Sequence, residues 1–270
     1  MMAEKNDSSY EKIIYEKKGE VAWITFNDEK KFNCMSTKMQ DELIDALERI
    51  EVDDTIKCVV ITGAGDKAFS SGGDLSHFDT YFDLLKAYNF FRNYFYKIQN
   101  LITNTEKIFI AAINGVCFAG GLEVALCCDF RIASDKATTG VLEINIGGVP
   151  GGGGTARLAK SIPMSKAKEL LMTGDRISAE EAYRLFIFDK VVSHEKLYDA
   201  VNEFTDKICN KPFLAIRRIK TAVNKMAETP GMDAALEIER GVNAMLIQSE
   251  DFREGVAAFS EKRSPRWKGR

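Results

Sequence analysis

Histidine is scarce in this sequence, and its cysteines lack the spacing of a metal site. The two histidines, His77 and His194, have no metal ligand four residues further on, and no Cys-x-x-Cys pair occurs. Several cysteines lie inside apolar runs, which is typical of buried free thiols in a reducing compartment. We therefore expect neither a metal site nor disulfides. The six cysteines are Cys34, Cys58, Cys117, Cys127, Cys128 and Cys209.

Long apolar runs are missing as well. No stretch of 18 or more apolar residues occurs, and a membrane-spanning helix requires one. The polar start of the chain, MMAEKNDSSYEK, lacks the apolar core of a signal peptide. We therefore expect a protein without membrane contact that is located in the cytoplasm.

Charge of one sign is not in excess, because 37 Lys and Arg face 40 Asp and Glu, for a net charge of -3. This balance argues against nucleic acid as a partner. Basic residues nevertheless gather at the end of the chain. The simplest interpretation is a solvated tail, and a local anion site is the alternative. The cluster consists of Lys262, Arg263, Arg266, Lys268 and Arg270.

The chain of 270 residues, 45% of them hydrophobic, is long enough for one sizeable domain with or without a small appendage. Up to residue 155, strand and helix patterns alternate, which favours an α/β core with largely parallel strands. Beyond it the pattern is helical, apart from a strand at 190–192. We expect strands at 13–16, 21–26, 56–62, 107–113 and 130–133, helices at 36–51 and 83–103, and a turn at 69–75. Later helices are expected at 155–160, 165–172, 178–184, 195–209, 212–228, 231–247 and 250–261.

Aromatic residues are concentrated in and just before the expected helix at 83–103. Core packing at helical spacing explains most of them. They are so dense, however, that we expect some to line an apolar ligand pocket. The rings are Phe78, Tyr81, Phe82, Tyr88, Phe90, Phe91, Tyr94, Phe95 and Tyr96.

Two glycine pairs, 72–73 and 120–121, each follow an expected strand. Backbone amides at the start of a helix are free to bind a ligand oxygen, and glycine lets that oxygen approach closely. Two such amides that converge on one carbonyl oxygen form an oxyanion hole. The alternative, that these glycines only permit tight turns, stays open.

Two glutamates lie in apolar surroundings: Glu123, just after the second glycine pair, and Glu143, between Leu142 and Ile144. A buried carboxylate is costly unless it is paired or functional. Two of them in one apolar pocket suit general acid/base catalysis, because burial raises the pKa of one while hydrogen bonds keep the other ionised. The alternative is a structural glutamate that caps a helix or pairs with an arginine.

The other glycine-rich segments do not match nucleotide-binding motifs. The loop at 147–154 (GGVPGGGG) lacks the Gly-Lys-Ser/Thr of a phosphate loop. The turn at 63–65 has no glycine three residues further on, so a dinucleotide site is weakly supported. A serine nucleophile elbow is not present either.

The motifs resemble those of the crotonase (enoyl-CoA hydratase/isomerase) superfamily over nearly the whole chain, from residue 13 to residue 262. The glycine pairs match the two oxyanion motifs of that family, and the glycine-rich loop matches its I-P-G-x-G-G-T segment. The matching segments are KFNCM at 31–35, AFSSGGDL at 68–75, residues 114–123, VPGGGGT at 149–155, REG at 253–255 and FSEK at 259–262.

The resemblance implies a ββα spiral core, which we place in residues 1–200, and a helical trimerisation region in residues 201–270. It implies a homotrimer or a dimer of trimers. Coenzyme A enters as part of an acyl-CoA substrate, so we expect no separate cofactor.

The resemblance also implies roles for individual residues. The amides of Gly73 and Gly120 hold the thioester oxygen, Glu123 activates water, and Glu143 exchanges the proton at the α-carbon. Family members with both glutamates look like hydratases, which favours a lyase that reversibly hydrates a 2-enoyl-CoA. The CoA-binding candidates are Lys31, Ser71 and Asp74 of one chain, with Phe259 and Lys262 of a neighbouring subunit.

Three departures from the family pattern concern the acyl group. Thr139 and Leu142 replace a bulky ring and a proline before Glu143, which changes the pocket wall. Phe186 replaces a helix-ending glycine, so that the left-handed cap is lost and the ring adds to the acyl pocket or to an interface. Together with the aromatic segment, these changes favour a larger or cyclic acyl group. An isomerase, a cyclic β-diketone hydrolase and a non-catalytic acyl-CoA-binding protein remain as alternatives.

Overall fold

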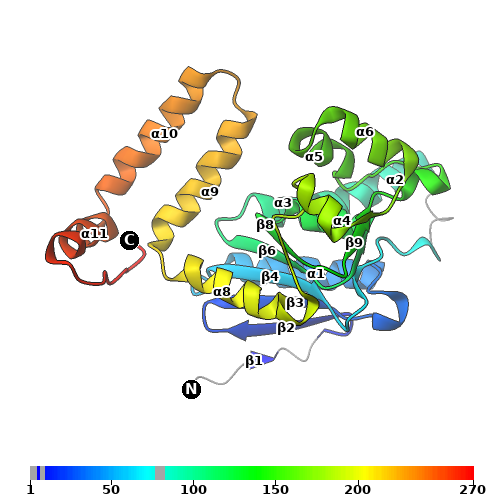
Figure 1. Ribbon diagram of the computed structural model, residues 1–270, viewed down its shortest axis with the longest axis horizontal. Helices are drawn as coiled ribbons and strands as arrows, with labels where there is room; N and C mark the ends of the chain where they lie inside the picture. Colours follow the sequence, from blue (N-terminus) through cyan, green and yellow to red (C-terminus); the bar gives the residue numbers. More distant parts are fainter. Residues whose placement is uncertain (1–4, 7–9, 77–82) are drawn as a thin grey trace.

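The main sheet has seven strands in the order β1-β2-β3-β4-β6-β8-β11 (Figure 1). The computed structural model describes residues 5–6, 10–76 and 83–270. Strands β1 to β3 pair antiparallel, and from β3 to β11 each neighbouring pair is parallel, as predicted. The strands are β1 (Lys5–Asn6), β2 (Ile13–Lys18), β3 (Val21–Phe26), β4 (Cys58–Gly63), β6 (Ile108–Ile113), β8 (Phe130–Ser134) and β11 (Lys190–Val192).

A second sheet of four short strands, in the order β10-β9-β7-β5, was not predicted. Three of its strands follow a main-sheet strand after a few residues, so that β4 leads to β5, β6 to β7 and β8 to β9. Strands of two or three residues are too short for an alternating pattern to show, and β5 lies mostly within the segment predicted as a turn. The strands are β5 (Ala68–Ser70), β7 (Val116–Phe118), β9 (Thr138–Gly140) and β10 (Ile177–Ser178).

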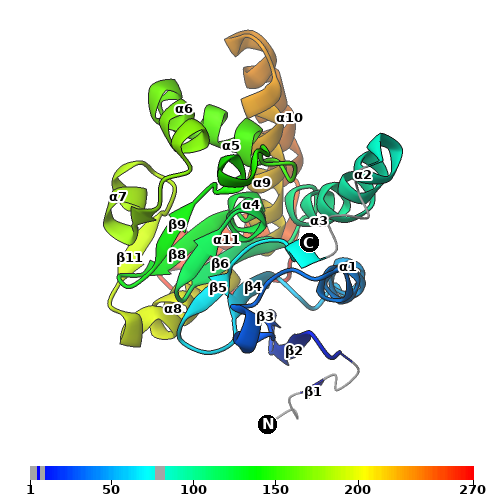
Figure 2. The same ribbon diagram turned by 90° about the vertical axis from the view of Figure 1, so that its right-hand side faces the viewer.

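The main hydrophobic core lies on one side of the large sheet, where α1 (Thr37–Glu51) and α3 (Lys97–Thr103) pack. The predicted N-cap of α1, Ser36, accepts a hydrogen bond from the amide of Met39 at 3.2 Å. Helix α8 (Leu197–Cys209) covers the opposite face of the sheet over a second core (Figure 2). The predicted apolar face of α1 is buried and consists of Met39, Leu43, Leu47 and Ile50.

The helix expected at 83–103 is divided by a π-helical segment. It consists of α2 (Leu84–Phe91), the π helix Arg92–Tyr96 and α3. The other helices of the core are α4 (Gly120–Cys127), α5 (Gly154–Ser161), α6 (Met164–Thr173) and α7 (Ala179–Arg184). Short 3-10 helices lie at Glu29–Lys31, Glu143–Ile146 and His194–Lys196.

Three helices extend beyond the core: α9 (Phe213–Glu228), α10 (Met232–Ile247) and α11 (Glu250–Glu261). Figure 1 shows α9 and α10 as a pair directed away from the sheets, with α11 remote from α4, α5 and α6. Lys220 anchors α9 on the core, because its buried amine donates to the Asp129 carboxylate at 2.9 Å and to the Lys107 carbonyl at 2.7 Å. The predicted boundary after residue 200 falls inside α8, and the trimerising role of the helices stays a prediction.

Within the described ranges, no helix combines the length and the apolar character needed to cross a membrane. In the same part of the chain, no three His, Cys, Asp or Glu side chains gather in a way that could hold a metal ion. All six cysteines have free thiols.

Candidate active site

The first oxyanion candidate, the amide of Gly73, lies just beyond the short strand β5. Gly73 forms a parallel bridge with Met35, whose amide donates to the Gly72 carbonyl at 2.8 Å. The amide of Asp74 points to the Met35 carbonyl at 3.5 Å. Because successive amides of an extended chain point in opposite directions, the Gly73 amide faces away from Met35.

The second candidate, the amide of Gly120, opens α4 directly after β7. The preceding Ala119 has φ +47° and ψ −124°, a conformation that a residue with a Cβ rarely adopts. A Cβ placed on Gly120 would lie 3.5 Å from the Gly73 nitrogen, so the two segments are adjacent. Neither amide donates a hydrogen bond to a described residue. Two adjacent glycine amides without an acceptor among the described residues are consistent with an oxyanion hole, which stays a prediction.

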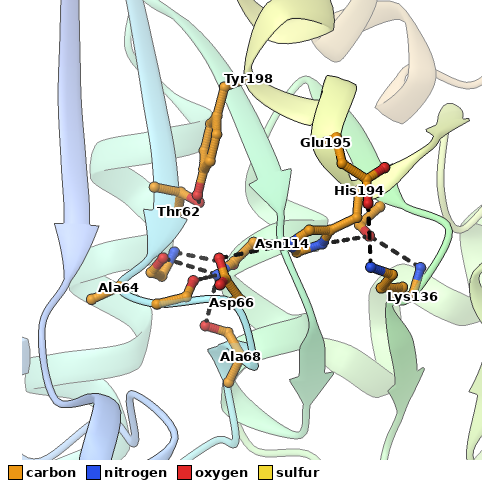
Figure 3. A network of polar contacts seen from close by, with 12 residues as sticks. Thr62, Ala64, Asp66, Ala68, Asn114, Lys136, His194, Glu195 and Tyr198 are labelled. Carbon is orange, nitrogen blue, oxygen red and sulfur yellow. Dashed lines mark hydrogen bonds and ion pairs between the residues drawn. The ribbon is translucent and has the colours of Figure 1, made fainter.

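Asn114 joins the two segments that carry these glycines (Figure 3). It lies between β6 and β7, and its side-chain amide donates to the carbonyls of Gly63, Gly65 and Ala68 at 2.9, 2.7 and 3.2 Å. These carbonyls lie at the end of β4, in the connection that follows and at the start of β5. One buried side chain therefore fixes the starts of β5 and β7, which lead to the two oxyanion candidates. In the sequence analysis Asn114 belonged to a matching motif, but no role was predicted for it. The signal that could have revealed this role is an asparagine directly after an apolar strand.

His194 occupies the other part of this network (Figure 3). Its Nδ1 lies 3.0 Å from the Ser134 hydroxyl and its Nε2 lies 3.6 Å from the Asp66 carboxylate. The series Ser134, His194, Asp66 resembles a Ser-His-Asp catalytic triad. Ser134 is fully buried, however, and its oxygen already accepts from the Lys136 amide at 3.0 Å. A nucleophilic serine has to reach a substrate. His194 therefore acts as a structural link between the segments after β4 and β8.

Glu123 projects from the first turn of α4 and is only 3% exposed. Its Oε1 accepts hydrogen bonds from the amides of Gly152 and Gly154 at 2.7 and 2.9 Å. Burial raises the pKa of Glu123 to about 7, although these two hydrogen bonds lower it in part. A Cβ on Gly152 would come within 2.4 Å of the other carboxylate oxygen. The glycine-rich loop is therefore shaped around this carboxylate rather than around a nucleotide.

Glu143 opens the 3-10 helix Glu143–Ile146 and is half-buried. Burial raises the pKa of this carboxyl too. Its Oε2 is buried and has no hydrogen-bond partner among the described residues, which is costly for a group without a ligand. The charge of Glu143 contributes to the raised pKa of Glu123. The structure therefore brings the two glutamates together, and their catalytic roles stay a prediction.

Two rings of the aromatic segment stand against this site. A Cβ placed on Gly120 or Gly152 would lie 3.1 or 2.8 Å from the buried ring of Phe95, and one placed on Gly151 would lie 2.6 Å from Phe91. They form an apolar wall beside the glutamate loop. Tyr88 and Tyr96 of the same segment are exposed, so they do not fit the prediction that these rings line a ligand pocket. The predicted rings of Phe78, Tyr81 and Phe82, and also His77, lie outside the described residues.

The three CoA-binding candidates of the core lie next to Gly73. The amine of Lys31 is 3.4 Å from the Asp74 carboxylate, and the Ser71 hydroxyl donates to the Lys31 carbonyl at 3.3 Å. A phosphate that binds Lys31 would therefore compete with Asp74 for the same amine.

Phe259 and Lys262 do not join this group within one chain. They belong to the end of α11, which Figure 1 shows far from α4. The Phe259 side chain is 87% exposed. Their predicted position over the site of a neighbouring subunit stays a prediction.

The departures from the family pattern have different structural outcomes. Thr139 is fully buried and its hydroxyl donates to the Cys117 carbonyl at 2.6 Å, so it acts on the pocket only through packing. Leu142 lies directly before the 3-10 helix that carries Glu143, and it packs near Gly140.

The predicted loss of the left-handed cap is wrong, because Phe186 itself adopts φ +60°. Its ring is 75% exposed, which excludes it from an acyl pocket within this chain and leaves the interface role open.

Comparison with known proteins shows the family and the fold of the chain. A family model described as enoyl-CoA hydratase/isomerase matches residues 16–270. The chain belongs to this family. It is similar to crotonyl-CoA hydratase of Syntrophomonas wolfei, with 38% identity over 255 residues that cover 94% of this chain and 97% of the relative. It is also similar to carnitinyl-CoA dehydratase of Escherichia coli, with 35% identity, 96% coverage of this chain and 99% of the relative.

A solved structure shows the same fold within the enoyl-CoA hydratase/isomerase family. It is an enoyl-CoA hydratase subunit of Geobacillus kaustophilus, with 35% identity, a TM-score of 0.90, and coverage of 97% of this chain and 100% of that one. The prediction of a crotonase-type α/β core followed by C-terminal helices is therefore confirmed. The prediction of an enoyl-CoA hydratase-like lyase is confirmed at the level of the enzyme class.

Proposed function

We propose that the protein reversibly adds water to the 2,3 double bond of an enoyl-CoA thioester. One observation carries the proposal. Two carboxyl groups with raised pKa, Glu123 and Glu143, converge beside two glycine amides that have no acceptor among the described residues. Relatives named crotonyl-CoA hydratase and carnitinyl-CoA dehydratase support this reaction class.

The oxyanion candidates act first in this reaction. The amides of Gly73 and Gly120 donate to the thioester oxygen and stabilise the negative charge that forms on it when the β-carbon is attacked. They are preorganised by backbone geometry, with Ala119 held at a positive φ. The enolate that results is the intermediate at which a proton is gained or lost.

The glutamates complete the addition. Glu123, with Oε1 held by two amides, takes a proton from water with its other oxygen while the hydroxide adds to the β-carbon. Glu143, in its protonated form, delivers its proton to the α-carbon, and burial favours that form by raising the pKa of the carboxyl. The atoms of one water molecule are thereby added, and proton exchange with solvent restores both carboxyls. A pKa of about 7, as for Glu123, suits a group that exchanges protons near neutral pH.

Coenzyme A binds as part of the substrate in this proposal, with no separate cofactor. Lys31, Ser71 and Asp74 lie beside the thioester position, whereas Phe259 and Lys262 reach it from a neighbouring subunit of a trimer or of a dimer of trimers. The rings of Phe91 and Phe95 border the site and favour a bulky or cyclic acyl group over a short one.

A panel of straight-chain and cyclic enoyl-CoA thioesters tests the proposal. Loss of the conjugated thioester absorbance reports hydration, and deuterium exchange at the α-carbon without water addition reports an isomerase. Glu143→Gln removes the proton donor with little change of shape, so we expect turnover to fall by about 10²- to 10⁴-fold. A circular dichroism spectrum serves as the folding control. Undiminished hydration by this variant, or binding of the panel without turnover by the wild type, would contradict the proposal.

A further inference from the structure

We propose that Cys58 and Cys209 form a thiol–disulfide exchange site, at which a low-molecular-weight disulfide oxidises the pair to an intramolecular disulfide. The two sulfur atoms lie 3.7 Å apart although 151 positions separate them in the chain. Neither cysteine belongs to the candidate active site. The proposal is therefore independent of the proposed hydratase function.

The pair lies between two rigid elements. Cys58 opens β4 in the middle of the main sheet, and Cys209 ends α8, which covers that face of the sheet. Both residues border the second hydrophobic core. Because a disulfide has a sulfur–sulfur distance of about 2.05 Å, the atoms have to approach by roughly 1.7 Å. Rotation about a Cα–Cβ bond can displace a sulfur atom by a distance of this order.

Cys209 is the thiol that a reagent reaches. It is half-buried, whereas the other five cysteines are buried. Lys57 donates to the carbonyl of Cys209 at 3.2 Å and so places a positive charge beside the thiol, although it also pairs with Glu20 at 2.7 Å. A nearby cation favours the thiolate, which is the reactive form. Cys58 is fully buried and acts only from inside the protein.

The exchange balances in two steps. The Cys209 thiolate attacks a disulfide RS–SR, forms the mixed disulfide Cys209–S–SR and releases RS⁻. The Cys58 sulfur then attacks the Cys209 sulfur, the new sulfur–sulfur bond forms, and the second RS⁻ leaves and takes the Cys58 proton. Two protein thiols are oxidised, and one small disulfide is reduced to two thiols.

The disulfide would fix the position at which the chain passes from α8 to α9. Directly after Cys209, the carbonyl of Asn210 accepts a hydrogen bond from the indole of Trp267 at 3.1 Å, so the C-terminal tail also meets this junction. A disulfide there ties β4 to the α8–α9 connection. We therefore expect oxidation to slow proteolytic cleavage between α8 and α9.

Equilibration of the full-length protein with glutathione disulfide tests the proposal. The wild type should fall from six titratable thiols to four after denaturation, and peptide mass mapping should find one linked pair of peptides that contain Cys58 and Cys209. Dithiothreitol should restore all six thiols. In Cys58→Ala, Cys209 should retain one glutathionyl group, because the resolving thiol is absent.

The control is Cys34→Ala, which removes a buried thiol that bonds to no other cysteine in the described part of the chain and should still form the 58–209 link. Three results would overturn the proposal. They are an unchanged count of six thiols, a link that involves another cysteine, or a glutathionyl group on Cys209 that persists in the wild type. The mapping on the wild type remains decisive even where a variant fails to fold.

Discussion

Opposing effects act on the pKa of Glu123, and the pH dependence of stability reports their balance. Two backbone amides favour its charged form, and burial, the larger effect, favours its neutral form, so that its pKa rises from 4.5 to about 7. Between these values the folded protein binds more protons than the unfolded chain. The free energy of unfolding therefore falls as the pH rises through this window, by at most about 3 kcal/mol for a shift of this size.

Glu123→Gln should remove this fall, because glutamine cannot ionise while its carbonyl still accepts from the two amides. We expect the variant to match the wild type near pH 4.5 and to exceed its stability at pH 8 by about 1–3 kcal/mol. Urea denaturation at both pH values measures this. Glu203→Gln is the control, since Lys207 lowers the pKa of Glu203 and places its titration below the window. An equally steep fall in Glu123→Gln would refute the assignment.

Gly152 shows how closely the loop encloses the carboxylate. In Gly152→Ala the new Cβ would lie 2.4 Å from Glu123 Oε2, so the carboxylate has to move away from the water that we propose it activates. We expect turnover to drop by about 100-fold, as misplacement of a catalytic group by an ångström does. Steady-state hydration kinetics measure this, with Gly241→Ala as the control because its Cβ meets nothing within 4 Å. Full turnover in Gly152→Ala would mean that the loop yields instead.

At the scale of elements, the short sheet positions the amides of the site. Strands β5 and β7 lie side by side and parallel, and each ends just before one oxyanion candidate. Strands of three residues contribute little stability of their own, so their position depends on the connections that start them. Asn114 is the side chain on which both connections converge.

Asn114→Asp removes the donors while keeping the shape. We expect it to cost about 1–3 kcal/mol of stability, because the carbonyls of Gly63 and Gly65 lose this donor. If the oxyanion amides separate, kcat should also fall by about 100-fold at a nearly constant KM. The exposed Asn104→Asp is the control. A purely structural asparagine would lower the melting temperature and leave kcat of the folded enzyme unchanged, and that split decides between the two roles.

At the scale of the whole molecule, helices α9 and α10 form an arm that buries few of its side chains. Helix α10 contains no buried residue, and α9 and α10 expose a set of large apolar side chains. Such surfaces are usually covered by a partner. This supports the proposal of an oligomer in which α11 of one subunit serves the site of another. The exposed side chains are Ile219, Val223, Met232, Met245 and Ile247.

Subunit mixing tests this arrangement. A Glu143→Gln chain lacks the acid, and a Phe259→Ala/Lys262→Ala chain lacks the cover for CoA. If Phe259 and Lys262 of a neighbouring subunit cover CoA, hybrid oligomers refolded from both variants should contain some sites in which Glu143 and the neighbour's α11 are both intact. We therefore expect hydration at low substrate concentration to exceed the sum of the two separate variants. Simple additivity would show that α11 serves its own chain or none.

Much of the architecture could be predicted from sequence because it rests on local patterns. Helix α1 begins at Ser36 and buries the expected face, and the apolar strands β4, β6 and β8 are where their β-branched runs predicted. The second sheet could not be predicted in this way, since its strands are shorter than the period of any pattern. The left-handed Phe186 was also missed, because the surrounding turn imposes that conformation on a residue that rarely adopts it.

For the site, the residue types pointed to two glutamates and two glycine pairs and left structural roles open, because a buried carboxylate is costly unless it is paired or functional. Which of their atoms face one another was decided only by the tertiary structure. Gly152 and Gly154 lie about 30 positions from Glu123 yet hold its carboxylate, and Asn114 reaches back some 50 positions to the carbonyl of Gly63. Such contacts depend on how the spiral stacks its strands, a property of the whole fold that no local pattern records.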